Sequence, residues 1–533
     1  MTMVKARERR RARRATRSGM ALVMVTVTIV AAGSTGSAAV PRRSPSGAVS
    51  SEGAPSQGAD VAAGLATTRA PKAPVRICGT KSLDGPAKRP QGAKRVSTNR
   101  DLGAMAANSP KGTTFWLEPG VHTLGGGEFD QVIPRDGQTF IGAPGAILDG
   151  QQLNRYAFTQ PAENVTIEHL TIQNFKGAAQ EGVVNHDYGR GWTIKHNTIK
   201  NNGGAGVFLG TDTVVAGNCL VRNGQYGFSA YSPDGIRNVV LRRNEIAYNN
   251  QDDWEAQWPG CGCTAGGKFW ETTGAKVVKN YVHHNIGTGV WVDYNNTGFL
   301  IKDNFFRANE GIALFYEVSY NGAIVDNTFV RNGHVEGPEL PGFPLPTIYV
   351  SESGSDSRVG ARFGSTFDIT GNRLVDNWAG IIGWENSDRF VGAVEGNDLV
   401  TRVNPGVATL ANCSDPDTIK TAPYFDDCRW KTQNLRVTRN RFVLRPDRVP
   451  GCTPEAGCGF TGLVSNYGTW PDWSPYQANI VPDAITFEQN NRWAQNKYVG
   501  PWHFMIHQLF NEVSWRTWRS GKYGQDLGST RTK

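Results

Sequence analysis

Four acidic residues end short apolar segments in the second half of this 533-residue chain: Asp293, Glu317, Glu352 and Glu385. An aromatic residue stands two positions before each of the first two acids, at Trp291 and Phe315. Paired carboxylates next to aromatic rings can hydrolyse sugar chains, because one carboxyl group donates a proton and the other attacks or stabilises the sugar. We therefore take Asp293, Glu317 and Glu352 as candidate catalytic acids and Glu385 as a candidate substrate ligand.

Lys268 allows two interpretations besides hydrolysis. Carboxylate oxygens can hold Ca²⁺, and a lysine beside them can remove the C5 proton of an acidic sugar in elimination or epimerisation. Alternatively, Lys268 pairs with Asp293 in a surface salt bridge, and the face binds glycans without catalysis. Trp291, Trp270 and Phe315 would stack on sugar rings in any of these cases. The residues alone leave hydrolysis, calcium-assisted elimination and simple binding open, and they predict no resident metal ion.

A repeat must position these residues. An asparagine followed by a second one five residues later recurs inside short apolar stretches, and uninterrupted units are 21, 24 and 23 residues apart. The pairs are Asn197/Asn202, Asn218/Asn223, Asn244/Asn249, Asn280/Asn285, Asn304/Asn309, Asn327/Asn332, Asn372/Asn377 and Asn491/Asn496. A fixed period in this range is the signature of a repeat architecture.

The physics of such a unit predicts an all-β solenoid. Each unit holds two or three short strands, whose apolar side chains are buried only when the next unit stacks on them. Neighbouring strands then pair in parallel about 4.8 Å apart. Asparagine at one turn position can pass amide hydrogen bonds from unit to unit and tolerates left-handed backbone. The leucine pattern of a horseshoe repeat is absent from the sequence.

Residues 110–500 resemble right-handed parallel β-helix proteins of the pectate-lyase-like superfamily. The segments Phe115–Gly120 and Gly142–Gly150 resemble their entry region. Three later segments, Gly266–Phe269, Gly289–Asp293 and Phe315–Glu317, resemble a group of secreted, actinobacterial-type β-helix proteins. The resemblance implies a right-handed parallel β-helix with N-terminal and C-terminal caps and a polysaccharide partner. It does not choose a reaction, because this fold hosts hydrolases, lyases, epimerases and adhesins alike.

Aligning the units on their asparagines predicts which side chains are neighbours. Trp291 lies 13 residues before Asn304 and Lys268 lies 12 before Asn280, so Lys268 should stand beside Trp291 on an outward face. Alternation along the strands turns Trp291, Asp293, Phe315 and Glu317 outward. Glu352 and Glu385 are expected to continue the same acidic file. Stacked carboxylates repel one another, so this file needs a compensating cation, a shared proton or a catalytic purpose.

No basic cluster suited to polygalacturonate is evident, nor a string like the Asp-Pro-His-Asp of alginate epimerases. A polyanionic substrate would meet an acidic face here and would need a bridging metal. These departures favour a neutral or mixed glycan as the substrate and hydrolysis as the reaction.

Charge and composition divide the chain into segments. Residues 1–38 carry a net +7 of the total +9 and consist of a basic run, an apolar stretch and small residues, which predicts a signal peptide and a secreted protein. The remaining +2 excludes nucleic acid as an expected partner. We expect no membrane contact after signal cleavage, and a monomer. The further expected segments are a disordered linker at 39–77, an N-terminal cap with first coils at 78–150, the β-helix core at 151–405, disulfide-bearing insertions with a late coil at 406–480, and a last coil with the C-terminal cap at 481–533.

Eight cysteines in an exported chain favour disulfides over metal ligation. Cys413 with Cys428 and Cys452 with Cys458 are close enough in sequence to form local loop clips. The partner of Cys219 stays open between Cys261, Cys263 and neither.

Overall fold

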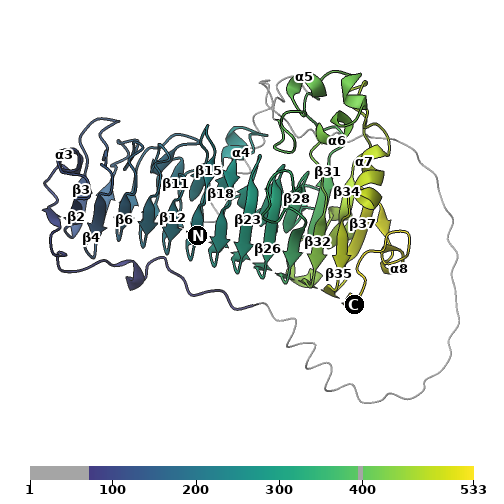
Figure 1. Cartoon of the computed structure of the whole chain (residues 1–533). Helices are drawn as coiled ribbons and strands as arrows, with labels where there is room; N and C mark the ends of the chain where they lie inside the picture. The colour runs from purple at the N-terminus through teal and green to yellow at the C-terminus, as the bar shows by residue number, and fades with distance from the viewer. Residues whose placement is uncertain (1–70, 394–399, 533) are drawn as a thin grey trace, which may run out of the picture.

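Short strands stacked in coils form the body of the protein in the computed structural model, which describes residues 71–393 and 400–532 (Figure 1). The predicted signal peptide at 1–38 and most of the predicted linker lie outside the described residues. The first coils contribute strands to sheets A and B, and from β6 onward the coils pass through three sheets in the order A, B, C. The stack is a parallel β-helix, as the repeat predicted.

The strands of the three sheets are short. Sheet A contains β1 (Lys94–Val96), β2 (Thr114–Leu117), β4 (Thr139–Gly142), β6 (Thr166–Glu168), β9 (Thr193–Lys195), β12 (Val214–Ala216), β15 (Ile236–Arg237), β16 (Val240–Arg242), β19 (Thr272–Thr273), β20 (Lys276–Val278), β23 (Thr297–Lys302), β26 (Tyr320–Val325), β29 (Phe367–Thr370), β32 (Leu435–Thr438) and β35 (Arg492–Ala494). Sheet B contains β3 (Gly120–Thr123), β5 (Ala146–Asp149), β7 (Thr171–Gln173), β10 (Thr198–Lys200), β13 (Cys219–Val221), β17 (Glu245–Ala247), β21 (Tyr281–His283), β24 (Phe305–Arg307), β27 (Thr328–Val330), β30 (Arg373–Val375), β33 (Arg441–Val443), β36 (Lys497–Val499) and β39 (Thr530–Thr532). Sheet C contains β8 (Gly182–Val184), β11 (Ala205–Leu209), β14 (Phe228–Ala230), β18 (Ala265–Phe269), β22 (Thr288–Val292), β25 (Leu314–Glu317), β28 (Ile348–Ser351), β31 (Ile381–Glu385), β34 (Phe460–Ser465), β37 (His503–Gln508) and the antiparallel β38 (Glu512–Val513).

Helices are short and lie at the ends or in insertions. They are α3 (Leu102–Ala107), α4 (Trp254–Gln257), α5 (Leu410–Cys413), α6 (Tyr424–Asp427), α7 (Ile480–Asp483) and α8 (Trp515–Trp518), with one-turn segments at Lys81–Leu83, Gly337–Glu339, Thr418–Lys420, Pro446–Arg448, Pro454–Ala456 and Ala484–Glu488. Across residues 71–393 and 400–532, none of these helices has the length and apolar character needed to cross a membrane.

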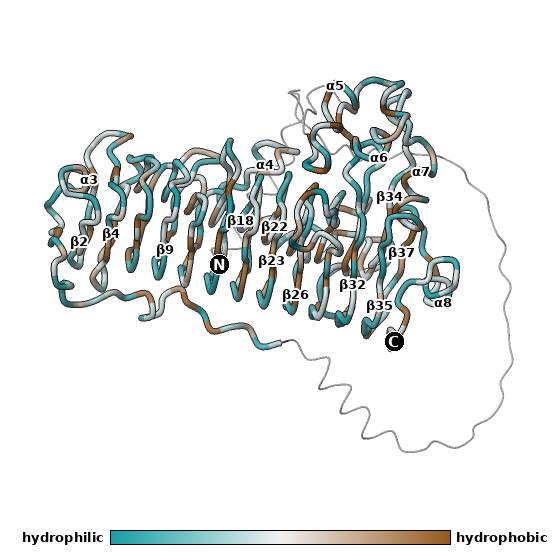
Figure 2. Tube along the Cα trace, viewed as in Figure 1, coloured by the Kyte–Doolittle hydropathy of each residue, from teal (hydrophilic) through white to brown (hydrophobic). Residues whose placement is uncertain are grey.

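One continuous apolar core fills the coils from Val96 to Trp518. Inward residues of β22 such as Val290 and Val292 are fully buried, whereas Trp291 between them is half-buried on the outside. Hydrophobic residues lie within the strands and hydrophilic ones at many of the turns (Figure 2). Helix α3 closes the first coils by burying Leu102, and α8 closes the last by burying Trp518.

The predicted stacking of asparagine side chains occurs, at two corners of the coils where one turn position was expected. In the ladder between sheets A and B, the backbone N of Asn280 donates to Oδ1 of Asn304 at 2.9 Å, and Nδ2 of Asn280 donates to the same oxygen at 3.0 Å. Asn304 in turn donates through Nδ2 to Val277 O at 2.8 Å and to Asn327 Oδ1 at 2.9 Å. A second ladder of the same kind runs from Asn202 to Asn377 between sheets B and C.

The last predicted pair, Asn491/Asn496, does not occupy the two ladders as the other pairs do. Asn496 follows Asn440 in the first ladder, where its Oδ1 accepts from the backbone N and Nδ2 of Asn440. Asn491 instead accepts from Leu435 N and donates to backbone carbonyls. A spacing of five residues therefore arises here without the two-ladder arrangement, because an insertion precedes Asn491.

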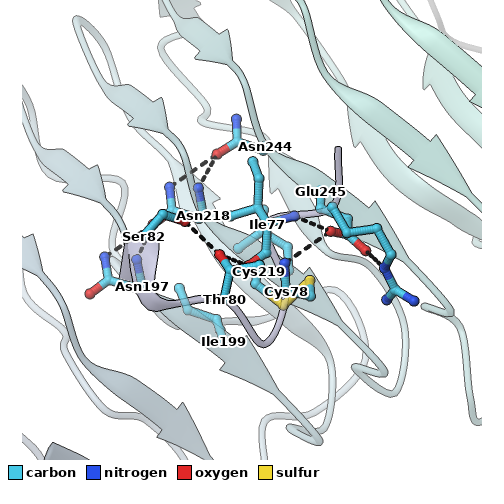
Figure 3. Close-up of a disulfide and its surroundings, with 12 residues drawn as sticks. Ile77, Cys78, Thr80, Ser82, Asn197, Ile199, Asn218, Cys219, Asn244 and Glu245 are labelled. Atoms are coloured by element: carbon cyan, nitrogen blue, oxygen red, sulfur yellow. Dashed lines mark hydrogen bonds and ion pairs between the residues drawn. A yellow bond between two sulfur atoms is a disulfide. The ribbon is translucent and has the colours of Figure 1, made fainter. Parts of the chain in front are cut away.

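An N-terminal strap, residues 71–88, runs along the outside of sheet B against the order of the coils (Figure 1). Ala73 packs on the side chains of Phe305 and Val330, and Pro86 accepts a hydrogen bond from Trp116 far back along the stack. Between these points Cys78 forms a disulfide with Cys219 on β13 (Figure 3). The strap thus ties late coils to early ones.

Glu245 is the buried anchor of the strap. Its carboxylate accepts from Ile77 N at 2.7 Å, Cys78 N at 2.9 Å and Arg76 Nε at 2.8 Å (Figure 3). Burial by itself would raise its pKa, but the hydrogen bond from His283 and those from the two amides outweigh burial and lower the pKa of Glu245 to about 2.

The remaining cysteines also pair. The bonds Cys413–Cys428 and Cys452–Cys458 confirm the predicted loop clips. Cys261 and Cys263 bond to each other, so Cys219 pairs with neither of them.

Insertions border the outer face of sheet C on both sides. Segments 248–264, 331–347 and 444–459 connect sheet B to sheet C, and segments 386–434 and 466–491 connect sheet C to sheet A. The insertions therefore leave from and return to the two edges of sheet C.

The asparagine ladder gives a stability prediction. Replacing Asn304 by alanine removes the acceptor of two Asn280 donors and leaves buried backbone carbonyls unpaired, so we expect a loss of about 3 kcal/mol in unfolding free energy, measured by chemical denaturation. Asn479 is exposed and makes no side-chain cap hydrogen bond, so Asn479→Ala should change stability by less than about 0.5 kcal/mol. Equal losses in the two variants would contradict a structural role for the ladder.

Candidate functional site on sheet C

The predicted side-by-side placement of Lys268 and Trp291 is confirmed. Lys268 on β18 is in register with Trp291 on β22. Trp291 is in register with Phe315 on β25, and Phe315 with Tyr349 on β28. Every second residue of these strands points into the core, which leaves this row on the outside. Tyr349 was missed by the sequence reasoning, although its place between Ile348 and Val350 could have revealed it by alternation.

Lys268 and Asp293 form an ion pair with a 2.7 Å separation between Nζ and Oδ2. Nζ also donates to the carbonyl of Gly262 at 2.7 Å. The ammonium lies 4.3 Å from the centre of the Trp291 ring and 5.5 Å from that of Trp270. Lys268 points outward, as expected, but it is only 9% exposed, because the Cys261–Cys263 loop covers it.

Glu317 lies at the next coil and is 5% exposed. Its Oε2 accepts from the indole Nε1 of Trp291 at 2.9 Å, and its Oε1 contacts Nη1 of Arg389 at 2.5 Å. The same guanidinium nitrogen lies 3.2 Å from Oε2 of Glu352. Arg389 therefore bridges two glutamates.

Arg389 was missed because it lies in the insertion between β31 and β32, outside the repeat. No pattern in the sequence marks it. The expectation that the stacked acids need a compensating cation is answered by this residue together with Lys268.

The expected four-member acidic file is wrong in its register. Glu317 pairs with Ser351, so Glu352 stands one position further along its strand, where a φ of 44° turns the backbone. Glu352 still reaches Arg389, and it accepts from Asn386 N at 2.8 Å and from Ser351 Oγ at 2.5 Å.

Glu385 does not join the other acids. It is fully buried beneath the insertion, where it binds Arg429, and its Oε2 accepts from Thr432 N at 2.8 Å and Gln489 Nε2 at 2.6 Å. Its carboxylate has partners on both oxygens. The structure thus brings together Lys268, Trp291, Trp270, Phe315, Asp293, Glu317 and Glu352, and separates Glu385.

The pKa values of Lys268, Glu317 and Glu352 are all raised, for different reasons. Burial by itself would lower the pKa of Lys268, but attraction to Asp293 outweighs burial and raises it. Burial raises the pKa of Glu317 and raises that of Glu352 to about 7, although Arg389 opposes the shift in both cases. Repulsion from the Glu317 carboxylate adds to the raised pKa of Glu352.

Aromatic rings continue along the face. Trp291 and Phe315 stack with centroids 4.8 Å apart, and Phe315 and Tyr349 stack at 4.6 Å. The ring centre of Phe343, from the insertion 331–347, lies 5.4 Å from that of Tyr349 and 5.7 Å from that of Trp384. Insertions thus contribute to the site from both sides: Gly262 and Phe343 from one side, and Arg389 from the other.

Within residues 71–393 and 400–532, no three or more His, Cys, Asp or Glu side chains gather as a metal site. At the sheet C site, nitrogen atoms of Lys268 and Arg389 contact the carboxylates directly.

A family profile described as "Right handed beta helix region" matches residues 181–359. The chain is a right-handed parallel β-helix. No curated protein matches the chain.

Three solved structures are among those similar to this chain. The catalytic unit of a GH87 α-1,3-glucanase from Streptomyces thermodiastaticus is 14% identical, with 84% of this chain and 70% of that one covered and a TM-score of 0.46. The A-module of mannuronan C-5 epimerase AlgE4 from Azotobacter vinelandii is 13% identical, with 57% and 92% covered and a TM-score of 0.40. PfbA, a surface adhesin of Streptococcus pneumoniae, is 10% identical, with 56% and 82% covered and a TM-score of 0.28.

The raised pKa of Glu352 predicts a pH effect on stability. The folded protein holds this proton more tightly than the unfolded chain, so the stabilisation is fully present below about pH 4.5 and is lost as the pH rises through about 7. Between about pH 4 and pH 8, we expect the unfolding free energy of the wild type to fall by roughly 3 kcal/mol more than that of Glu352→Gln. Denaturant titrations at several pH values measure this difference. The exposed-carboxylate variant Glu163→Gln should follow the wild type, and parallel curves for wild type and Glu352→Gln would contradict the assignment.

Proposed function

We propose that the protein is a secreted, polysaccharide-active enzyme that hydrolyses glycosidic bonds at the sheet C site. The observation that carries the proposal is the placement of two carboxylates on adjacent coils in different surroundings. Asp293 faces the ammonium of Lys268 at 2.7 Å, while Glu317 is buried and has a raised pKa. Such a division separates a proton donor from a charged carboxylate.

The proposed reaction uses the acids in turn. Glu317 donates its proton to the glycosidic oxygen as the bond to C1 breaks, and the Asp293 carboxylate attacks C1. Water then displaces Asp293 from C1 and returns a proton to Glu317. Adjacent coils are about 4.8 Å apart, close to the separation of about 5 Å at which two carboxyl groups retain the anomeric configuration.

The other residues have supporting roles in this proposal. Trp291 donates to Glu317 and, with Phe315 and Trp270, offers apolar surface for sugar rings. Arg389 and Glu352 are positioning residues, because they set the charge and orientation of Glu317 without needing to touch the substrate.

Calcium-assisted elimination is the second candidate, since Lys268 could serve as its base. Two contacts argue against that role. Nζ already donates to Asp293 and Gly262, and its pKa is raised, so the ammonium keeps its proton at neutral pH. A glycan-binding protein without catalysis is the third candidate. The burial of the charged groups beneath insertions favours an enzyme over a flat, solvated binding face.

Release of reducing ends and of absorbance at 235 nm from a panel of neutral and acidic polysaccharides, with and without Ca²⁺, tests the proposal. We expect reducing ends without absorbance from at least one neutral or mixed glycan. Glu317→Gln and Asp293→Asn should each lower kcat/KM by at least about 10²-fold, while Glu163→Gln should leave it unchanged. Activity should fall as the pH rises through the raised pKa of Glu317, because the proton donor is then lost.

The same panel identifies the competing functions. Calcium-dependent absorbance at 235 nm would replace hydrolysis by elimination and make Lys268 the residue to change. Full activity in Glu317→Gln would remove the sheet C site from the reaction. Binding of a glycan without any product would favour the non-catalytic function.

A further inference from the structure

The disulfide between Cys261 and Cys263 encloses a single residue, Gly262, in the insertion 248–264. A disulfide restrains the unfolded chain more strongly when more residues lie between its two cysteines. The cysteines of the other three bonds are 6, 15 and 141 residues apart, against 2 residues here. This bond therefore restrains the unfolded chain least of the four, and its main effect is on the short loop that it closes.

Gly262 contacts two side chains that in turn contact the carboxylates of the sheet C site. Its carbonyl oxygen accepts from Nζ of Lys268 at 2.7 Å, and the same nitrogen lies 2.7 Å from Oδ2 of Asp293. Its Cα lies against the ring of Trp291, since a Cβ built on Gly262 would come within 3.0 Å of Cη2 of that ring. Trp291 donates to Glu317. One loop of three residues thus reaches Asp293 through Lys268 and Glu317 through Trp291.

The loop holds Gly262 in this place from both sides. The backbone of Gly262 is left-handed, with a φ of 57°, which glycine adopts without the strain that other residues suffer. On one side, Cys263 is buried, and its carbonyl oxygen accepts from Nε2 of Gln225 at 3.0 Å. On the other side, Cys261 is half-buried and is tied to Cys263 by the disulfide. Without the bond, the side of the loop at Cys261 would lose this restraint.

We propose that the Cys261–Cys263 disulfide is a clamp on the sheet C site, which holds the Gly262 carbonyl against the Lys268 ammonium and thereby positions the Asp293 carboxylate. The carbonyl and the carboxylate each accept one proton of the ammonium, so the side chain of Lys268 is fixed between them. The loop also covers the ion pair, and exclusion of water strengthens the attraction between the two charges. Gly262 and the two cysteines are positioning residues. The effect of the clamp on catalysis rests on the proposed function, whereas its effect on Lys268 does not.

Thiol–disulfide exchange with a small-molecule dithiol can open the clamp. One thiolate of the dithiol attacks Sγ of Cys261, and Sγ of Cys263 leaves as a thiolate. The second thiolate of the dithiol then displaces Sγ of Cys261, so that the dithiol becomes a cyclic disulfide and the two cysteines take up its two protons. The clamp is then open, and Lys268 becomes accessible.

The rate at which Lys268 is reductively methylated, followed by peptide mass spectrometry, tests the clamp without any substrate. We expect Lys268 to react roughly tenfold faster in Cys261→Ser/Cys263→Ser than in the wild type, because local opening exposes a protected group. Exposed Lys279 serves as the internal reference. The matched control is Cys452→Ser/Cys458→Ser, which removes a disulfide from the insertion 444–459 on the same side of sheet C. It should leave the rate at Lys268 within twofold of that of the wild type.

Activity on whichever polysaccharide the panel identifies gives the second measurement. Misplacing a reacting group lowers the rate of the chemical step, so kcat should fall by at least about tenfold in Cys261→Ser/Cys263→Ser, with a smaller change in KM. The control variant should keep both constants within twofold. Treatment of the wild type with dithiothreitol should have the same effect as the double substitution, and reoxidation should restore both kcat and the protection of Lys268.

The proposal is overturned if Lys268 reacts no faster in Cys261→Ser/Cys263→Ser, or if the control accelerates the reaction equally. Should the double variant fail to fold, the dithiol-treated wild type decides: Lys268 must become reactive when Cys261 and Cys263 become open to alkylation, and must be protected again after reoxidation. Faster labelling of Lys268 without cleavage of any polysaccharide would remove the proposed hydrolysis and support the clamp. Cleavage with an unchanged kcat in the opened protein would overturn the positioning of Asp293 and leave the hydrolysis standing.

Discussion

Hydrogen bonds between asparagine amides at the corners of the coils are the contacts on which the rest of the protein depends. A coil of short strands must turn three times, and each turn buries backbone groups that the sheets cannot pair. One amide at the corner accepts from the asparagine of the preceding coil and donates to the following one, so these groups are satisfied along the stack. Because the first ladder links the coils from Asn197 to Asn496, it also helps to fix which outward side chains become neighbours.

The sheet C site illustrates what this scaffold supplies and what it does not. Register alone places Lys268, Trp291 and Phe315 in one row. Three carboxylates in such a small volume would repel one another strongly, and the cations that compensate them come from different sources. Lys268 belongs to a strand, whereas Arg389 belongs to an insertion that crosses back over the face. The repeat therefore provides the outward row with one of its cations, Lys268, and an insertion provides the other, Arg389.

The sequence predicted the features that follow from periodicity. Fold class, the stacking of asparagines at a turn and the outward row were accessible because each depends on spacing within one repeat. The position of Glu352 was missed by one residue, because the insertion 331–347 interrupts the repeat before β28 and hides its register against β25. Glu385 was misplaced and Arg389 was missed, because their surroundings are built by segments 386–434 and 466–491, which carry no repeat. Long-range ion pairs between an insertion and a strand leave no local signal in the sequence.

The N-terminal strap also constrains the order in which the protein can assemble. A chain emerging from its N-terminus delivers residues 71–88 first, yet their docking surface is made of residues up to Val330. Coils can stack one upon another as they appear, since each contacts only its neighbours. The strap must wait, with Cys78 unpaired until Cys219 has emerged 141 residues later and Ala73 uncovered for longer still. The strap is thus synthesised before its docking surface, and it can be fastened only after the coils up to Val330 have stacked.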